Sequence, residues 1–365
     1  MRLTPLDFEQ LPGWQPSELP AAWPAFLASC RAVATFAPPL RVGRPATSEF
    51  VELSSRALEI GDNPDAVSRF FRENFRPFEV LADTGAGEGF VTGYYEPELE
   101  GSSTRTTEFT APVLARPKDL IDMREADVTG WDRSLQGARR TADGRLAPYP
   151  SRAEIENCIL GDLAAPVVWL RDHVEVFFAQ VQGSARVRLT DGSHKRLVYA
   201  GRNGRSYTSI GRILINEGEI APEDMSLSSC KAWLRENGVQ IGDRGRTIMQ
   251  RNESYVFFRL EDDSDTRIGP TGGQGIPLWP LRSMAVDRAV WPYGTPIWIG
   301  ADLTTAGLGA GPIGRLMIAQ DTGSAIVGPA RGDLFIGSGA RAGEIAGLIR
   351  HSARFIVLLP VGFVA

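Results

Sequence analysis

The feature that most constrains the fold is a series of short apolar runs, rich in β-branched and aromatic residues, that are separated by Gly and Pro. From residue 255 onward such runs occupy residues 255–259, 283–286, 296–300, 315–319, 325–327, 333–336 and 354–359. Runs of this length and composition are typical of β-strands, and the glycines and prolines between them predict turns. The chain is therefore predicted to be mainly β, and many short strands of this kind favour a barrel.

Helical patterns occur mainly in the first hundred residues. Asn63-Pro64-Asp65 is a helix-start signal, and the apolar residues after it recur at helical spacing. We also expect a helix to begin at Pro24, with Cys30 on its apolar face. These helices are predicted to lie at the periphery of the β-structure.

The middle of the chain looks like an insertion. Its polar beginning, residues 102–144, is followed by apolar runs at 174–182 and 185–189, both predicted to be strands, and by a hairpin turn at Asp191-Gly192. Three helices are expected farther on, near residues 210–216, 227–236 and 342–350, and a glycine follows each of the first two.

Charge and hydropathy exclude two classes of protein. Lys and Arg number 39 against 44 Asp and Glu, the net charge is −5, and the chain has no basic block, so we predict no nucleic-acid partner. The longest apolar run, residues 355–365, contains Pro360 and is shorter than the ~20 residues of a transmembrane helix. Residues 1–5 have no apolar segment, so an export signal is absent from the chain as given.

Cysteine and histidine are too scattered for a metal site. Cys30, Cys158 and Cys230 form no Cys-x-x-Cys pair and are expected to be buried small side chains. The histidines lie far apart and lack the His-Glu-x-x-His spacing. We predict neither a metal nor a cofactor.

Two motifs fit catalytic or cofactor patterns by chance. Gly309 to Gly314 match G-x-G-x-x-G, but Pro312 and the strand that follows predict a turn between strands instead of a dinucleotide site. Ser228 to Lys231 match S-x-x-K, but they lie within a predicted amphipathic helix, and neither S-D-N nor K-T-G occurs in the chain.

Three aspartates adjoin predicted strands near the C-terminus: Asp287, Asp321 and Asp333. Aspartate is depleted in strands because its short polar side chain competes with the backbone ladder. Each aspartate alone could simply cap a turn. Three of them in one barrel predict a carboxylate cluster.

A series of motifs, in order along the chain, resembles the membrane-bound lytic murein transglycosylase A family. The stretches are Thr92–Tyr95, Tyr149–Glu154, Val181–Ser184, Tyr199–Gly204, Ser206–Gly211 and Glu253–Phe258. The aspartate-bearing segment resembles the three-aspartate (3D) domain that closes this family's chains. The resemblance covers about residues 88 to 353. Val327 stands where the family often has lysine, and one extra residue separates Asp321 from Asp333.

The resemblance implies a fold of two domains. A double-psi β-barrel with N-terminal helices is expected from residues 1–105 and 250–365. Residues 106–249 are expected to form an inserted β-domain, and the glycan would bind in the groove between the two domains.

The resemblance also implies the chemistry. Asp333 is the expected catalytic residue, acting as general acid and then as general base, with Asp321 beside it as a support. It would cleave the β-1,4 bond between N-acetylmuramic acid and N-acetylglucosamine to give a 1,6-anhydro product. Substrate-binding residues are expected at Thr92, Gly93, Tyr94, Tyr95, Gln182, Ser184, Asp287 and Gly323. Tyr94 and Tyr95 point to opposite faces of a strand, so one of them is expected to meet the sugar and the other to pack in the core.

The partner implied is the peptidoglycan glycan strand, with cell-wall synthesis or division proteins as further candidates, and we expect a monomer. Because this substrate lies outside the cytoplasm, we expect a periplasmic protein, with the outer membrane as a candidate site of attachment. Two other functions remain open. One is a glycoside hydrolase that uses water, with Asp321 and Asp333 as its two carboxylates. The other is a glycan-binding barrel without catalytic activity.

Overall fold

The computed structural model describes residues 1–81, 89–123, 132, 135–263 and 269–362. The chain forms two compact units. The first unit consists of Met1–Tyr95 and Arg267–Ala365, and the second of Glu96–Thr266. The second unit is longer at both ends than the insertion of residues 106–249 that we expected, because its first and last strands pair inside its own sheet.

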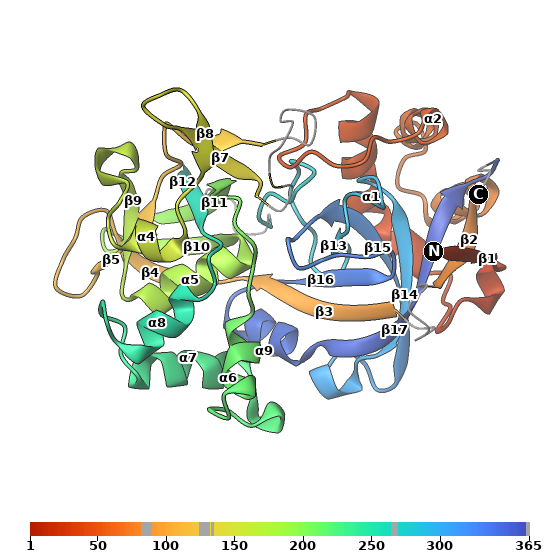
Figure 1. Ribbon diagram of the computed structural model, residues 1–365. Helices are drawn as coiled ribbons and strands as arrows, with labels where there is room; N and C mark the ends of the chain where they lie inside the picture. Colours follow the sequence, from red (N-terminus) through yellow and green to blue (C-terminus); the bar gives the residue numbers. More distant parts are fainter. Residues whose placement is uncertain (82–88, 124–131, 133–134, 264–268, 363–365) are drawn as a thin grey trace. The chain divides into compact units, whose positions relative to one another are not determined.

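The first unit contains a closed β-barrel (Figure 1). Its sheet has the strand order β1-β2-β17-β14-β15-β13-β16-β3, and a further antiparallel pairing of β17 with β3 closes the ring. The strands are β1 (Arg2–Pro5), β2 (Phe75–Leu81), β3 (Gly89–Glu96), β13 (Ser283–Val286), β14 (Pro296–Asp302), β15 (Pro312–Asp321), β16 (Arg331–Ser338) and β17 (Arg350–Pro360). Strand β17 can close the barrel because it is long: its first half pairs with β3 and its second half with β14 and β2.

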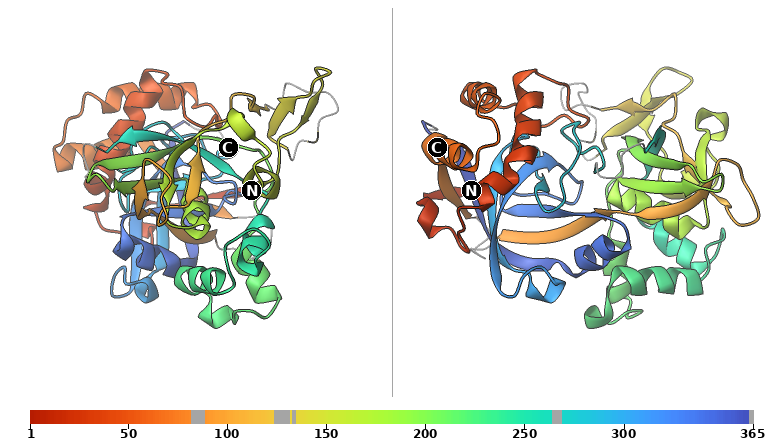
Figure 2. Two further views of the ribbon diagram at one scale, coloured as in Figure 1. Left: turned by 90° about the vertical axis from the view of Figure 1, so that its left-hand side faces the viewer. Right: turned by 180° about the vertical axis from the view of Figure 1, so that it is seen from behind.

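Helices cover one side of this barrel (Figures 1 and 2). They are η1 (Phe8–Gln10), α1 (Glu18–Ala34), α2 (Ser48–Ala57) and α3 (Pro64–Asn74), and their buried side chains form one core with Trp298, Leu316 and Ile318 of β14 and β15. Asn63 caps α3 as predicted, since its side chain accepts from the N–H groups of Asp65 and Ala66. η4 (Thr304–Ala306) and α9 (Ala340–Leu348) complete the unit.

The predicted start of a helix at Pro24 is wrong. Helix α1 begins at Glu18, and Pro24 lies inside it. The apolar face already starts at Leu19 and includes Trp23, both fully or almost fully buried, so packing stabilises the turn that Pro24 deprives of a backbone hydrogen bond. Cys30 is buried in this core and Cys230 in another, whereas Cys158 is exposed, contrary to expectation, and has a φ of 66°.

The second unit contains two sheets and several helices. One sheet has the order β12-β11-β10-β4-β9-β5 and the other the order β6-β7-β8. The strands are β4 (Glu98–Ser102), β5 (Ala111–Leu114), β6 (Ile121–Asp122), β7 (Gly137–Arg140), β8 (Leu146–Pro148), β9 (Pro166–Leu170), β10 (Ser184–Leu189), β11 (His194–Arg202) and β12 (Val256–Asp262). The helices are α4 (Arg152–Glu156), η2 (Gly161–Leu163), α5 (His173–Gln182), α6 (Ile210–Asn216), η3 (Pro222–Asp224), α7 (Leu227–Glu236) and α8 (Arg244–Gln250).

Residues 174–182, predicted to be a strand, form helix α5 instead. Signals at both ends outweigh the strand preference of valine and phenylalanine. The Asp172 side chain accepts from the N–H of Glu175 at 2.9 Å, and Gly183 ends the helix in the left-handed conformation with φ 84°. Residues 325–327 form no strand either, since they belong to the loop between β15 and β16.

The segment of residues 309–314, predicted to be a turn between strands, is a turn only in its first half, because β15 already begins at Pro312. The remaining predicted strands and helices agree with the structure. The strands expected at 283–286, 296–300, 315–319, 333–336 and 354–359 are all present, as are the helices near 210–216, 227–236 and 342–350. The chain is mainly β with peripheral helices, and it has a barrel unit and an inserted β-unit. Among the described residues, no helix combines the length and the apolar composition needed to cross a bilayer.

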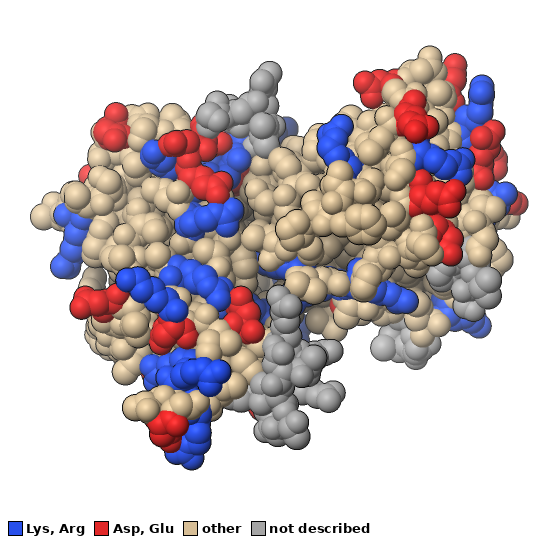
Figure 3. Space-filling view, turned by 90° about the horizontal axis from the view of Figure 1, so that it is seen from above, with Lys and Arg blue, Asp and Glu red and all other residues tan. Residues whose placement is uncertain are grey.

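Charged side chains of opposite sign lie close together on the surface. Figure 3 shows Lys and Arg interspersed with Asp and Glu on one face. In the second unit, for example, Arg171 pairs with both Glu100 and Glu108. Exposed pairs of this kind contribute about 0–1 kcal/mol each, so the stability of the fold rests on its buried clusters.

The helical layer gives a direct test of this point. Phe26 of α1 is fully buried and lies within 6.4 Å, between ring centroids, of Phe50, Phe70, Phe71 and Phe75. Phe26→Ala should reduce the free energy of unfolding by about 3–5 kcal/mol because it leaves a cavity. The matched change Phe36→Ala removes a side chain that is 78% exposed and should change stability by less than about 0.5 kcal/mol. Denaturant titration measures both; equal effects would contradict the packing described here.

Candidate active site

The short strand β13 brings two aspartates together. Ala285 of β13 is the register partner of Asp333 on antiparallel β16 and of Asp321 on parallel β15. Side chains in register across neighbouring strands lie on the same face of a sheet. The two carboxylates therefore flank one small residue.

An irregularity in the β13–β15 register places Asp321 there. Met284 pairs with Ala319, but Ala285 pairs with Asp321, so Gln320 is bypassed. Bulges of this kind re-aim side chains and are common beside active sites. Gln320 is fully buried on the α1 side, where its amide nitrogen donates to the Ala25 carbonyl at 2.7 Å and to Ser29 Oγ at 2.8 Å.

Asp333 is held through one of its oxygens. Thr92 Oγ1 on β3 donates to Asp333 Oδ1 at 2.5 Å, and Arg331 Nη2 donates to Thr92 Oγ1 at 2.7 Å. Burial raises the pKa of Asp333 to about 6, although the Thr92 hydrogen bond and the Arg331 charge lower it, and the nearby Asp321 raises it further. Asp333 can therefore carry a proton at mildly acidic pH.

Asp321 is held through both oxygens. The backbone N–H groups of Gly273 and Thr322 donate to Oδ1 at 2.7 and 2.8 Å, and the Tyr94 hydroxyl donates to Oδ2 at 2.9 Å. Burial, together with the adjacent Asp321, keeps the pKa of Tyr94 well above its usual range, so Tyr94 remains a donor. The environments of the two aspartates therefore differ: Asp321 is an acceptor with three donors, and Asp333 is a raised-pKa acid.

Arg41, which the sequence gave no reason to select, braces the Asp321 site. Its backbone N–H donates to the Gly273 carbonyl at 2.9 Å, and its Nη1 donates to the Thr322 carbonyl at 2.6 Å. Gly273 and Thr322 are the residues whose N–H groups bind Asp321, so Arg41 anchors both residues through the peptide group that follows each donor N–H. The Tyr293 hydroxyl fixes Arg41 in turn by donating to its carbonyl at 3.0 Å.

Gly273 is required here by close approach. A Cβ on this residue would lie 2.6 Å from the Tyr293 hydroxyl and 3.3 Å from Asp321 Oδ1. The Gly272–Gly275 segment therefore forms one wall of the site.

Asp287, just after β13, binds backbone groups. Its Oδ1 accepts from the N–H of Ala289 at 3.0 Å and its Oδ2 from the N–H of Gly328 at 2.8 Å. These contacts match the turn-capping role that was the alternative for each aspartate. Asp287 thereby ties the loop between β15 and β16 to the end of β13.

The other residues expected to bind substrate are distributed over both units. Gly93 lies against α9, where an added Cβ would be 2.9 Å from Ala346 Cα, and the buried Tyr95 ring packs against Gly343 of the same helix. Gly323 follows Asp321 in the loop and accepts from the N–H of Ile326 at 3.0 Å. Gln182 and Ser184 belong to the second unit, at the end of α5 and the start of β10.

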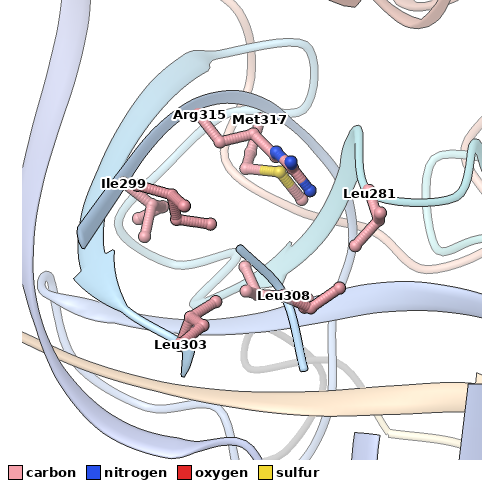
Figure 4. A pocket seen from close by; sticks show the side chains of 8 residues that line it. Leu281, Ile299, Leu303, Leu308, Arg315 and Met317 are labelled. Atoms are coloured by element: carbon pink, nitrogen blue, oxygen red, sulfur yellow. The ribbon is translucent and has the colours of Figure 1, made fainter. Parts of the chain in front are cut away.

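A small pocket in the first unit lies apart from these carboxylates. Its lining side chains point toward one another from β14, β15 and neighbouring loops, as Figure 4 shows for Ile299, Met317 and Leu308. Leu334 also lines it, and this residue follows Asp333 on β16, so the two side chains point to opposite faces of the strand. All lining side chains except Arg315 are apolar. An apolar lining of this kind does not suit a sugar chain.

No group of three or more His, Cys, Asp or Glu side chains in the described ranges could hold a metal ion.

Comparisons with known proteins identify the family to which this chain belongs. The sequence model of the MltA specific insert domain matches residues 90–259, and that of the 3D domain matches residues 282–359. Membrane-bound lytic murein transglycosylase A of Vibrio cholerae is 30% identical over 309 residues, which cover 84% of this chain and 73% of that protein. The Escherichia coli protein of the same name is 32% identical over 270 residues, or 73% of this chain and 64% of that one.

Solved structures agree. The crystal structure of a membrane-bound lytic murein transglycosylase from Agrobacterium tumefaciens is 35% identical with a TM-score of 0.86, and the match covers 99% of this chain and 98% of that one. MltA from Neisseria gonorrhoeae is 27% identical with a TM-score of 0.73, covering 99% and 92%. This chain therefore belongs to the membrane-bound lytic murein transglycosylase A family.

Proposed function

We propose that this chain is a peptidoglycan lytic transglycosylase in which Asp333 acts first as general acid and then as general base. The bond cleaved is the β-1,4 link between N-acetylmuramic acid and N-acetylglucosamine. The observation that carries the proposal is the position of Asp333, which shares a sheet face with Asp321 and accepts from Thr92 through Oδ1; burial there raises its pKa to about 6. An ordinary aspartate, with a pKa of ~3.9, would be too rarely protonated to give a proton away.

The reaction needs no co-reactant. The Asp333 carboxyl donates its proton to the glycosidic oxygen as the C1–O bond breaks, and the bonding electrons leave with that oxygen. The muramoyl 6-hydroxyl then attacks C1, and its proton passes to the Asp333 carboxylate. The products are a 1,6-anhydromuramoyl end and a free 4-hydroxyl, and the enzyme has its proton back.

The contacts of Asp321 favour this route over hydrolysis. A hydrolase needs a second carboxylate to attack the sugar or to activate water. Both oxygens of Asp321 already accept hydrogen bonds, from Gly273, Thr322 and Tyr94. Asp321 is therefore suited to supporting Asp333, whose pKa its charge raises.

We further propose that Thr92, Gly93, Tyr94, Tyr95, Gln182, Ser184, Asp287 and Gly323 include the glycan-contacting residues, as the family resemblance implies. Periplasmic peptidoglycan would be the substrate, and the "membrane-bound" name of the relatives supports association with a membrane, for which the outer membrane is our candidate. The family resemblance is the support for both statements.

Replacing the acid tests the proposal. Asp333→Asn should lower turnover of purified sacculi by at least about 10²-fold, because the amide is nearly isosteric but has no acid proton. Asp302→Asn, the same change at an exposed turn-capping aspartate, should leave turnover unchanged. An Asp333→Asn enzyme that kept more than about a tenth of wild-type activity would refute the assignment.

The same variant has a predictable stability. Since the folded-state pKa of Asp333 is raised, ionising it costs the folded protein stability; this cost is absent below about pH 4 and fully present above about pH 6. Asp333→Asn never carries that charge, so above pH 6 it should be at least as stable as the wild type. Thermal unfolding at pH 4 and pH 7.5 measures the difference, and a variant that is less stable than wild type only at pH 7.5 would contradict the raised pKa.

The role of Asp321 has its own signature. Asp321→Asn keeps an oxygen for the Gly273 and Thr322 amides but removes the negative charge that raises the Asp333 pKa. The pKa of Asp333 should fall, so the basic limb of the pH–rate profile should move to lower pH. If the limb does not move, the two carboxylates are not electrostatically coupled.

The origin of the attacking oxygen separates the transglycosylase from the hydrolase. Digestion of sacculi in ¹⁸O-labelled water should give unlabelled anhydromuropeptides, because the nucleophile is a hydroxyl of the sugar itself. A hydrolase would leave reducing ends that carry one ¹⁸O. Mass spectrometry distinguishes the two products, and mostly labelled reducing ends would overturn the mechanism even if Asp333 were essential.

A further inference from the structure

Four side chains on β3 and β16 form a two-by-two arrangement on one face of the barrel sheet, where these strands are neighbours (Figure 1). Phe90 and Thr92 are two residues apart on β3, and Arg331 and Asp333 are two residues apart on β16. Residues two apart on a strand share a face. The Arg331 guanidinium lies 5.5 Å from the Phe90 ring centroid and donates through Nη2 to Thr92 Oγ1.

The chemistry of these groups sets the direction of the hydrogen bonds. A guanidinium only donates, so Thr92 Oγ1 is the acceptor in its contact with Arg331. A hydroxyl has a single proton, and Asp333 Oδ1 accepts it at 2.5 Å. The chain therefore runs in one direction, from Arg331 through Thr92 to Asp333. Donation by a cation to a hydroxyl makes that hydroxyl a stronger donor.

We propose that Arg331 is a positioning residue which, through Thr92, stabilises the Asp333 carboxylate on Oδ1 and so leaves Oδ2 as the oxygen that exchanges the catalytic proton. The inference rests on the proposed role of Asp333. In the first step Oδ2–H gives its proton to the glycosidic oxygen while Thr92 donates to Oδ1. In the second step the muramoyl 6-hydroxyl returns a proton to Oδ2.

Because one carboxyl acts first as acid and then as base, the hydrogen bonds from Arg331 through Thr92 to Asp333 have a function. Burial alone keeps the Asp333 carboxyl protonated, as an acid requires. Burial also disfavours the carboxylate that the first step creates, so it makes the proton harder to release. Arg331 and Thr92 act in the opposite direction and favour that charged form. These hydrogen bonds therefore bring the protonated and ionised forms of Asp333 closer in free energy, and they do not involve Oδ2.

Arginine suits this position better than lysine. Its planar group can lie over the Phe90 ring and donate from its edge to Thr92 at the same time, and its Nη1 donates to the Gly332 carbonyl. The Phe90 ring, which is itself 44% exposed, lies between one face of the guanidinium and the solvent. Lysine would keep the charge but could not make these contacts together.

The test uses Arg331→Met, which keeps a long apolar side chain against Phe90 but removes the donor and the charge. The pKa of Asp333 should rise, so the basic limb of the pH–rate profile should move up by about one pH unit, while the maximal rate falls because the carboxylate is less stabilised. Thr92→Val should act in the same direction. Asp321→Asn is expected to move the basic limb in the opposite direction, to lower pH. A general loss of structure therefore cannot account for both shifts of the limb.

Coupling and control variants complete the experiment. In the Thr92→Val background, Arg331→Met should shift the limb clearly less than it does in the wild type, because the route through Thr92 is already gone. Arg331→Lys should fall between wild type and Arg331→Met. Arg354→Gln removes one arginine of the same unit that pairs with Glu79, and should not move the limb.

Titration of the Asp333 carboxyl by ¹³C NMR measures its pKa directly, without requiring turnover. An upward shift of this pKa in Arg331→Met supports the inference. An unchanged or lowered pKa, or equal shifts of the limb in the wild-type and Thr92→Val backgrounds, would overturn it. Unlabelled anhydro products from these variants in ¹⁸O-water would show that the proposed function stands even where the role of Arg331 fails.

Discussion

The pairing of β13 with β15 on one edge and with β16 on the other is the constraint on which the site depends. All four residues of β13 are buried, so the strand cannot slip without moving its whole side-chain set. Ala285 has Asp321 on one side and Asp333 on the other. A larger residue at this position would compete with the carboxylates for the same face.

The two aspartates are chemically different because their donors are different. Three donors surround Asp321, two of them backbone N–H groups of residues whose carbonyls bind Arg41. Asp333 has the Thr92 hydroxyl on one oxygen and burial as the dominant influence on its pKa. The same sheet face therefore carries one carboxylate that accepts three hydrogen bonds and one carboxyl whose pKa burial raises.

Much of this could be predicted from the sequence. The sequence predicts most strands of β-branched character within a few residues. The rarity of aspartate beside strands selects Asp287, Asp321 and Asp333 equally, and only the family resemblance singles out Asp333 with Asp321 beside it. The α5 segment was misassigned because its valines and phenylalanines suit a strand, while its decisive signals, Asp172 and Gly183, lie outside the apolar run. Local caps outweighed side-chain preference there.

What the sequence could not provide was contact between distant segments. Arg41 lies 232 residues before Gly273 (273 minus 41), and no periodicity links the two. Arg331 was within reach of sequence reasoning, since it shares a strand face with Asp333, but only the pairing of β16 with β3 shows that Thr92 stands between them.

The positive charges of this site therefore come from two arginines that act on the carboxylates through other groups. Val327 is 71% exposed in the loop between β15 and β16 and carries no charge. Arg41 binds the carbonyls of Gly273 and Thr322, the two residues whose N–H groups donate to Asp321, and Arg331 donates to the hydroxyl that binds Asp333. A direct ion pair with Asp333 would hold it ionised and remove the acid. An intervening hydroxyl weakens the effect enough that the carboxyl can both release a proton and take one back.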